Sequence, residues 1–93
     1  MARSFKGSVL QAIANGQCPK GFPADLMAAA RRKLFMVTYA AEIRDLRVPP
    51  GNRLEMLKGD REGFYSIRIN EQWRVCFRWQ GGRAEDIEIT DYH

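Results

Sequence analysis

Two stretches of alternating residues in the second half of the chain constrain its fold most strongly. In Trp73–Trp79, aromatic and aliphatic residues alternate with Arg74, Cys76 and Arg78. Phe64–Ile69 alternates in the same way. Because successive side chains of a β-strand point to opposite faces, this period of two predicts two strands, each with one apolar face and one face that carries arginine.

Neighbouring segments extend this sheet. The Gly-Gly pair at 81–82 is a strong hairpin signal, and Ala84–Thr90 follows it as a last strand. Asn52–Leu57 alternates Arg53 and Glu55 with apolar residues. We therefore expect a further strand there, with Glu55 on the arginine-bearing face.

The N-terminal half is predicted to be helical. Lys6–Asn15 has apolar residues at helical spacing, and Ala24–Leu46 is rich in Ala, Leu, Met, Arg and Lys. Val-Thr-Tyr at 37–39 is weak helix material, so we expect a break there and a shorter helix over Ala40–Leu46. The Val-Pro-Pro-Gly run that follows ends the helical region. The short segment Ala2–Phe5 could add an edge strand.

Helices followed by an antiparallel meander predict an α+β fold, in which the N-terminal helices pack on one face of a small antiparallel sheet. The arginine-bearing face then stays open to solvent, as one face of an antiparallel sheet often does. The stripe that would pack on the sheet recurs at helical spacing: Leu26, Ala30, Lys33, Leu34 and Val37, broadened by Met27, Phe35 and Ala41.

Length and charge narrow the functional classes. A chain of 93 residues is one domain, residues 1–93, and its net charge of +4 fits a polyanionic partner such as nucleic acid. The alternative is a soluble protein that happens to be basic. Cys18 and Cys76 form no CxxC pair and have no histidine nearby, so we expect no metal site and no cofactor. The sequence lacks a signal peptide and a transmembrane span, which predicts a cytoplasmic protein without membrane contact.

Strand pairing turns the arginine-bearing face into a candidate site. If the faces of the two alternating strands match, Arg68 lies directly opposite Arg74, with Arg78 further along the same face. Two arginines across a ladder repel each other. An anion between them resolves this, and a phosphate suits the guanidinium fork. The alternative is that each arginine is a solvated surface residue, bridged by Glu55 or Glu88.

Two further groups flank this face. Lys58 and Arg61 belong to a glycine-bounded charged loop beside the same groove, and an ordinary solvated turn is the alternative for that loop. The chain ends in Asp91-Tyr92-His93. Histidine is the side chain best suited to proton transfer near neutral pH, and tyrosine can stack on a base. The competing interpretations of His93 are a tail without structure or a residue left from a purification tag.

Several motifs together resemble the HigB-type toxins of bacterial toxin–antitoxin systems, in the RelE/ParE superfamily. They are SFK near the start, PPGNRLEMLKGDREGFYSIRINEQWRVCFRW in the middle and DYH at the end. The PPGNRLE wording is most similar to the GraT-like branch. The resemblance covers essentially the whole chain and is strongest over Pro49–Trp79 and Asp91–His93.

The resemblance implies a RelE-like microbial RNase fold and a metal-independent, ribosome-dependent mRNA endonuclease that inhibits translation. It implies a HigA-type helix-turn-helix antitoxin as partner, with the ribosome and mRNA, and with operator DNA contacted through the antitoxin. By motif, it implies catalytic roles for Lys58, Arg74, Asp91, Tyr92 and His93. The neighbouring basic residues are expected to bind substrate: Arg53, Arg61, Arg68 and Arg78.

One position departs from the family pattern. Many members have a histidine in the sequence LHPLKG, where this chain has Glu55 in LEMLKG. Glu55 and His93 are therefore the candidates for acid–base catalysis. Two other functions are compatible with the same basic face: a non-catalytic RNA- or protein-binding module, and a ParE-like gyrase poison on the same fold.

Overall fold

The computed structural model describes residues 7–59 and 63–91. The possible edge strand at Ala2–Phe5 lies outside these residues. The elements in chain order are α1 (Gly7–Ala14), the 3-10 helix η1 (Ala24–Leu26), α2 (Met27–Tyr39), the 3-10 helices η2 (Ile43–Arg47) and η3 (Pro50–Asn52), β1 (Glu55–Met56), β2 (Phe64–Arg68), β3 (Trp73–Gln80) and β4 (Arg83–Asp91).

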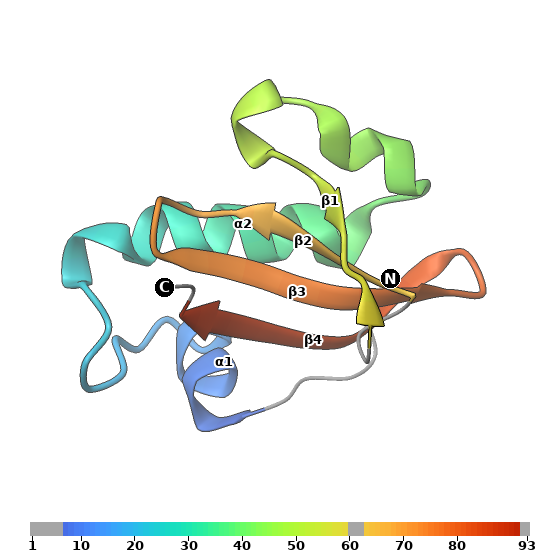
Figure 1. Cartoon of the computed structure of the whole chain (residues 1–93). Coiled ribbons are helices and arrows are strands. Elements are labelled where there is room, and N and C mark those ends of the chain that lie inside the picture. The colour runs from blue at the N-terminus through green and yellow to red at the C-terminus, as the bar shows by residue number, and fades with distance from the viewer. Residues whose placement is uncertain (1–6, 60–62, 92–93) are drawn as a thin grey trace.

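The strands form one four-stranded antiparallel sheet in the order β1-β2-β3-β4. Helix α2 lies behind this sheet and α1 lies beside β4, so that both helices leave the viewer-facing side of the sheet uncovered (Figure 1). The predicted α+β architecture, with helices on one face of a small antiparallel sheet, is confirmed. No helix in residues 7–59 and 63–91 is long and apolar enough to cross a membrane.

The core lies between the helices and the apolar face of the sheet. The predicted stripe of α2 is buried at Ala30, Lys33, Leu34 and Val37. Its fully buried partners come from α1 and from strands β2, β3 and β4: Leu10, Ile13, Ile67, Val75, Phe77 and Ile87.

Two of the three residues expected to broaden this stripe do not face the core. Phe35 is 63% exposed and Ala41 is also exposed. Phe35 follows Leu34 directly, and one step along a helix rotates the side chain by about 100°, which turns it away from the core. It packs instead against Tyr39 on the surface, with ring centroids 4.4 Å apart.

The break or kink expected over 37–39 falls at the end of that segment. Helix α2 continues through 37–39 and ends at Tyr39, because Val37 is buried in the core and Thr38 Oγ1 donates to the carbonyl oxygen of Leu34 at 2.8 Å. Packing thus overrides the weak helix propensity of these residues.

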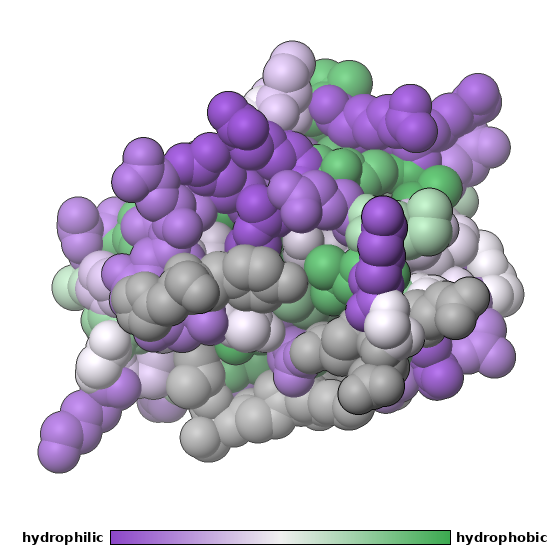
Figure 2. All heavy atoms as spheres, in the orientation of Figure 1, coloured by the Kyte–Doolittle hydropathy of each residue, from purple (hydrophilic) through white to green (hydrophobic). Residues whose placement is uncertain are grey.

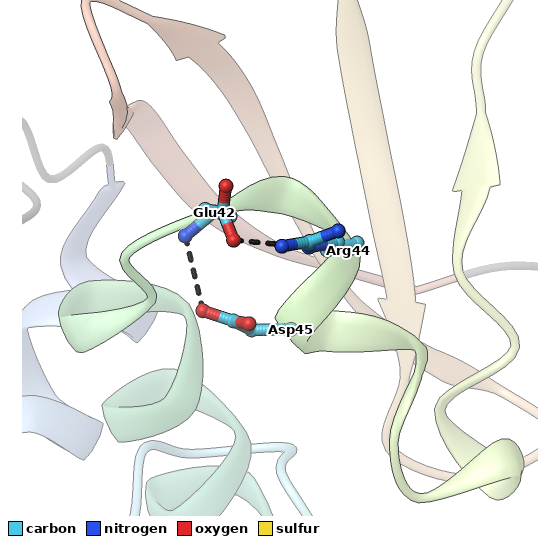
Figure 3. Close-up of polar contacts among 3 residues, drawn as sticks. All are labelled: Glu42, Arg44 and Asp45. Atoms are coloured by element: carbon cyan, nitrogen blue, oxygen red, sulfur yellow. Dashed lines mark hydrogen bonds and ion pairs between the residues drawn. The ribbon is translucent and has the colours of Figure 1, made fainter.

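The shorter helix expected over Ala40–Leu46 is present only in part and as a 3-10 helix. The backbone is extended at Ala40, and the short 3-10 helix η2 follows. Local polar contacts fix its start, as Figure 3 shows: the backbone N–H of Glu42 donates to Asp45 Oδ2 at 3.0 Å, and Arg44 Nε donates to Glu42 Oε2 at 2.9 Å.

The strand expected over Asn52–Leu57 is reduced to the two residues of β1. Before it, the chain forms η3, and Arg53 adopts the left-handed conformation with φ 46°. That conformation costs roughly 1–2 kcal/mol in a residue with a Cβ. The expectation that Arg53 and Glu55 lie on the same face of one strand is therefore wrong, because Arg53 precedes β1.

A buried polar bridge connects α2 to this region. Lys33 is 9% exposed, and its Nζ donates to Oδ1 of the fully buried Asn52. Asn52 Nδ2 donates in turn to the carbonyl oxygens of Leu46 at 3.1 Å and Val48 at 3.3 Å. Burial, and to a lesser extent the nearby charge of Arg32, lowers the pKa of Lys33 from 10.5.

This lowered pKa predicts a pH-dependent stability. Between the folded-state pKa and 10.5, the unfolded chain binds more protons than the folded chain, so Lys33 makes the free energy of unfolding rise with pH in that interval. We expect wild type to gain stability relative to Lys33→Met as the pH is raised toward 10.5, as measured by urea unfolding. A difference that stays constant or falls would contradict this expectation.

The predicted register of the inner strands is confirmed. Arg68 lies opposite Arg74 and Phe64 lies opposite Arg78. Between β3 and β4 the register shifts near Cys76 and Arg78, and Asp86 adopts a positive φ of 49°. The sequence analysis did not predict this irregularity, which carries Asp86 to the side of Arg78.

Candidate active site

The candidate site occupies the face of the sheet that the helices leave uncovered. In Figure 2, hydrophilic side chains gather over the upper part of this face. Alternation and register assign to it one carboxylate of β1, three side chains from each inner strand and three from β4: Glu55, Phe64, Ser66, Arg68, Arg74, Cys76, Arg78, Glu85, Glu88 and Thr90. The expectation of a fully open face is wrong at its centre, where Ser66 and Cys76 are completely buried.

Arg74 is the anchored cation of this face. Its Nη1 donates to Ser66 Oγ at 3.0 Å, and its Nη2 lies 3.1 Å from Glu55 Oε1. The Arg74 side chain is only 14% exposed, whereas that of Glu55 is 54% exposed. Strands β1, β2 and β3 each supply one member of this group, so the sheet itself sets the direction of the guanidinium.

The contacts around Arg74 show what lies beside the two arginines that face each other across the strands. Arg68 lies opposite Arg74, and its Nη2 is 3.7 Å from Oε1 of the highly exposed Glu71, which is a loose contact. Arg74 itself pairs with Glu55. In the structure a carboxylate of the chain, Glu55, therefore lies beside Arg74, as the bridged alternative expected.

The other basic candidates lie in different surroundings. Arg78 Nη2 pairs with Asp86 Oδ2 at 3.1 Å, so its guanidinium is turned toward β4. Arg53 is exposed on the turn before β1, and Lys58 is exposed in the loop after β1. Arg61 lies outside the described residues.

The C-terminal candidates are described only in part. Asp91 ends β4 opposite Trp73, which places its side chain on the face of the sheet opposite to that of Arg74. Its Oδ2 accepts a hydrogen bond from Gln72 Nε2 at 3.2 Å. Tyr92 and His93 lie outside the described residues.

The sequence analysis missed several polar partners of the candidate residues. Ser66 was placed on the right face but was not assigned a role, although only the Ile67–Val75 pair separates it from the opposed arginines along β2. Asp86 and Gln72 were not singled out. Within residues 7–59 and 63–91, no group of His, Cys, Asp and Glu side chains has the arrangement of a metal site.

Comparison with known proteins decides the family. Residues 3–93 match the model of a family described as the RelE-like toxin of type II toxin–antitoxin system HigB. The chain belongs to the HigB-like toxin family. Among HigB-like relatives, Toxin HigB-1 of Vibrio cholerae serotype O1 is 40% identical over 85 residues, which cover 90% of each chain. Endoribonuclease HigB of Proteus vulgaris is 33% identical over 93 residues, which cover both chains completely.

Solved structures agree with the RelE-like fold expected of a HigB-like toxin. A point mutant of YafQ from E. coli superimposes with a TM-score of 0.66 at 11% identity, covering 98% of this chain and 91% of that one. The YoeB–YefM complex from Staphylococcus aureus gives a TM-score of 0.63 at 16% identity, covering 100% and 95%. The family resemblance and the fold inferred from the sequence are both confirmed.

Proposed function

We propose that this HigB-like toxin is an endoribonuclease that cleaves mRNA on the ribosome in the cytoplasm and thereby inhibits translation. The observation that carries the proposal is the anchoring of Arg74 by Ser66 and Glu55 on a basic sheet face. A full-length relative with 33% identity is named as an endoribonuclease, which supports the same reaction class.

The proposed reaction uses the 2′-hydroxyl of the RNA as nucleophile on the adjacent phosphate. It needs a base for that hydroxyl, a cation for the charge that develops on the phosphorane, and an acid for the departing 5′-oxygen. None of these roles requires a metal ion. Arg74 stabilises the phosphorane, with Arg68 and Lys58 assisting, because a positioned guanidinium lowers the energy of that charge without reorganising.

Acid–base catalysis is assigned to Glu55 and His93. Glu55 pairs with Arg74 before substrate binds, so phosphate binding to Arg74 releases the carboxylate beside the reacting group. Tyr92 stacks on a substrate base, and Asp91 orients the C-terminal residues. The other arginines assigned to the candidate site bind the RNA backbone: Arg53, Arg61, Arg68 and Arg78.

The proposal includes the partners typical of a type II toxin. A HigA-type helix-turn-helix antitoxin neutralises the toxin, and the complex contacts operator DNA through the antitoxin. The ribosome presents the mRNA. Identification of a helix-turn-helix protein encoded beside this gene, followed by co-purification of the two proteins, tests the antitoxin assignment directly.

Brief induction of the toxin followed by primer extension on a cellular mRNA tests the reaction. We expect discrete cuts within codons. Intact mRNA together with blocked DNA supercoiling would assign the chain to the gyrase poisons instead. Intact mRNA and normal supercoiling, with RNA or a protein still bound, would assign it to the non-catalytic binding modules.

Glu55→Gln tests whether the carboxylate takes part in the chemistry. If Glu55 transfers a proton, the substitution lowers kcat by about 10²-fold or more and leaves KM nearly unchanged. The measurement is the steady-state rate of mRNA cleavage by the purified variant over a range of concentrations of ribosome-bound mRNA.

The matched control is Glu42→Gln, which removes an exposed carboxylate paired with Arg44 at 2.9 Å at the start of η2, outside the sheet. We expect this variant to retain wild-type cleavage. Full activity of Glu55→Gln would show that Glu55 is only a structural bridge to Arg74, and His93 would then be the sole acid–base candidate.

A further inference from the structure

The Lys33–Asn52 bridge lies on the helix side of the sheet, away from the candidate active site, and the proposed function does not use it. Lys33 is the one charged side chain that is buried in the part of the chain the structure describes. No carboxylate of residues 7–59 and 63–91 forms an ion pair with it. A buried ammonium without a carboxylate is costly, and an apolar side chain at the same position of α2 avoids that cost.

The hydrogen bonds of Asn52 explain what the bridge holds in place. A lysine ammonium can only donate, so the amide oxygen of Asn52 must face Lys33 and its amide nitrogen must face the carbonyl oxygens of Leu46 and Val48. Every polar atom of the Asn52 side chain is thereby engaged. The bridge ties the middle of α2 to the end of η2 and to η3 at a single buried point.

That point lies directly upstream of the proposed catalytic carboxylate. Asn52 ends η3, Arg53 follows in the left-handed conformation, and Glu55 begins β1. Since β1 has only two residues, its pairing with β2 fixes the position of Glu55 weakly, and the buried anchor at Asn52 supplies the rest.

We infer that Lys33 and Asn52 are positioning residues, which hold the η3 turn so that Glu55 reaches Arg74. The inference rests on the proposed catalytic role of Glu55 for its effect on cleavage, but not for its effect on the geometry of the Glu55–Arg74 pair. The bridge acts through Glu55 alone and touches neither the RNA nor Arg74.

Two substitutions break the bridge from opposite ends. Lys33→Met removes the donor on α2. Asn52→Asp keeps the side-chain shape and still accepts from Lys33, but it cannot donate to the carbonyl oxygens of Leu46 and Val48. The matched control is Lys20→Met, which removes an exposed lysine in the loop before η1.

The first readout requires no cleavage. The side-chain Nη2–Hη2 signal of Arg74 in a ¹H–¹⁵N spectrum reports its contact with Glu55, because Nη2 is the nitrogen that donates to Glu55 Oε1. In Lys33→Met and in Asn52→Asp we expect this signal to move toward its position in Glu55→Gln, while Lys20→Met leaves it in place. An unmoved Arg74 signal in both folded variants would overturn the inference.

The second readout is cleavage in a double-mutant cycle. Each bridge substitution is expected to lower the cleavage rate by about 10- to 100-fold, as a misplacement of roughly 1 Å does in other active sites. In the Glu55→Gln background the same substitutions should cause no further loss, because the effect passes through Glu55. Equal losses in both backgrounds would show a general structural role and would contradict positioning.

These readouts separate the inference from the proposed function. Full cleavage by Glu55→Gln would exclude a catalytic role for Glu55. The Arg74 signal would still test whether the bridge holds Glu55 and Arg74 together. Circular dichroism establishes that each variant folds, and Asn52→Asp decides the matter if Lys33→Met does not fold. Loss of the fold in both variants would assign the bridge to stability alone and overturn the inference.

Discussion

Replacing Arg74 by alanine is expected to lower mRNA cleavage by about 10²–10³-fold, the usual cost of removing one preorganised donor to a developing charge. The expectation follows from the geometry of the guanidinium, which is held by Ser66 on one nitrogen and by Glu55 on the other and is mostly shielded from water. The measurement is single-turnover cleavage of ribosome-bound mRNA, together with the loss of growth inhibition after induction.

Arg74→Lys and Arg83→Ala are the control variants for Arg74→Ala. Lysine keeps the charge but lacks the planar fork, so we expect cleavage between that of wild type and that of Arg74→Ala. Arg83→Ala changes the net charge by the same amount as Arg74→Ala and removes a pair with Glu85 at the hairpin, so it controls for the basicity of the chain. Full killing by Arg74→Ala would refute the assignment of the phosphate site to this face.

Removal of the C-terminal histidine is expected to have an effect at least as large. His93→Ala, or deletion of Tyr92 and His93, should lower cleavage by about 10²–10⁴-fold, the range for the loss of a general acid or base. The side chain that changes its charge between about pH 5 and 8 is histidine, so the pH dependence of cleavage in that interval should flatten in the variant.

Two measurements keep this prediction specific. Co-sedimentation with ribosomes should be the same for His93→Ala and wild type, because the arginines that bind RNA are intact. Added imidazole should restore part of the cleavage by His93→Ala and none of that by Arg74→Ala. Wild-type cleavage by the truncated chain would leave Glu55 as the acid–base group and would remove His93 from the site.

The parts of the fold that follow from local alternation could be predicted, and those that depend on distant contacts could not. The opposition of Arg68 and Arg74 follows from matching apolar faces across two strands, and the structure has this register. The short β1 could not be predicted in the same way, because the left-handed Arg53 follows an asparagine whose position depends on Lys33, far away in the sequence.

The same distinction applies to the candidate site. The sequence placed Glu55 and Arg74 on one face but left open whether a carboxylate of the chain or an external anion lies beside Arg74. The structure gives the carboxylate. Ser66 is uncharged and was not predicted to belong to the site, although its hydroxyl accepts a hydrogen bond from the Arg74 guanidinium. A lysine within an otherwise apolar stripe was the one signal in the sequence for the buried partner Asn52.

The two-residue length of β1 has a consequence for hydrogen exchange. Proteins open in local units whose free energies range from near zero at weakly held edges to the full stability of the core. Arg74 lies on β3, an inner strand whose Val75 and Phe77 are fully buried, whereas Glu55 lies on a minimal strand at the sheet edge. The amides of the β1 segment should therefore exchange well before those of β3. The two halves of the Glu55–Arg74 pair can then separate and rejoin while the rest of the molecule stays folded.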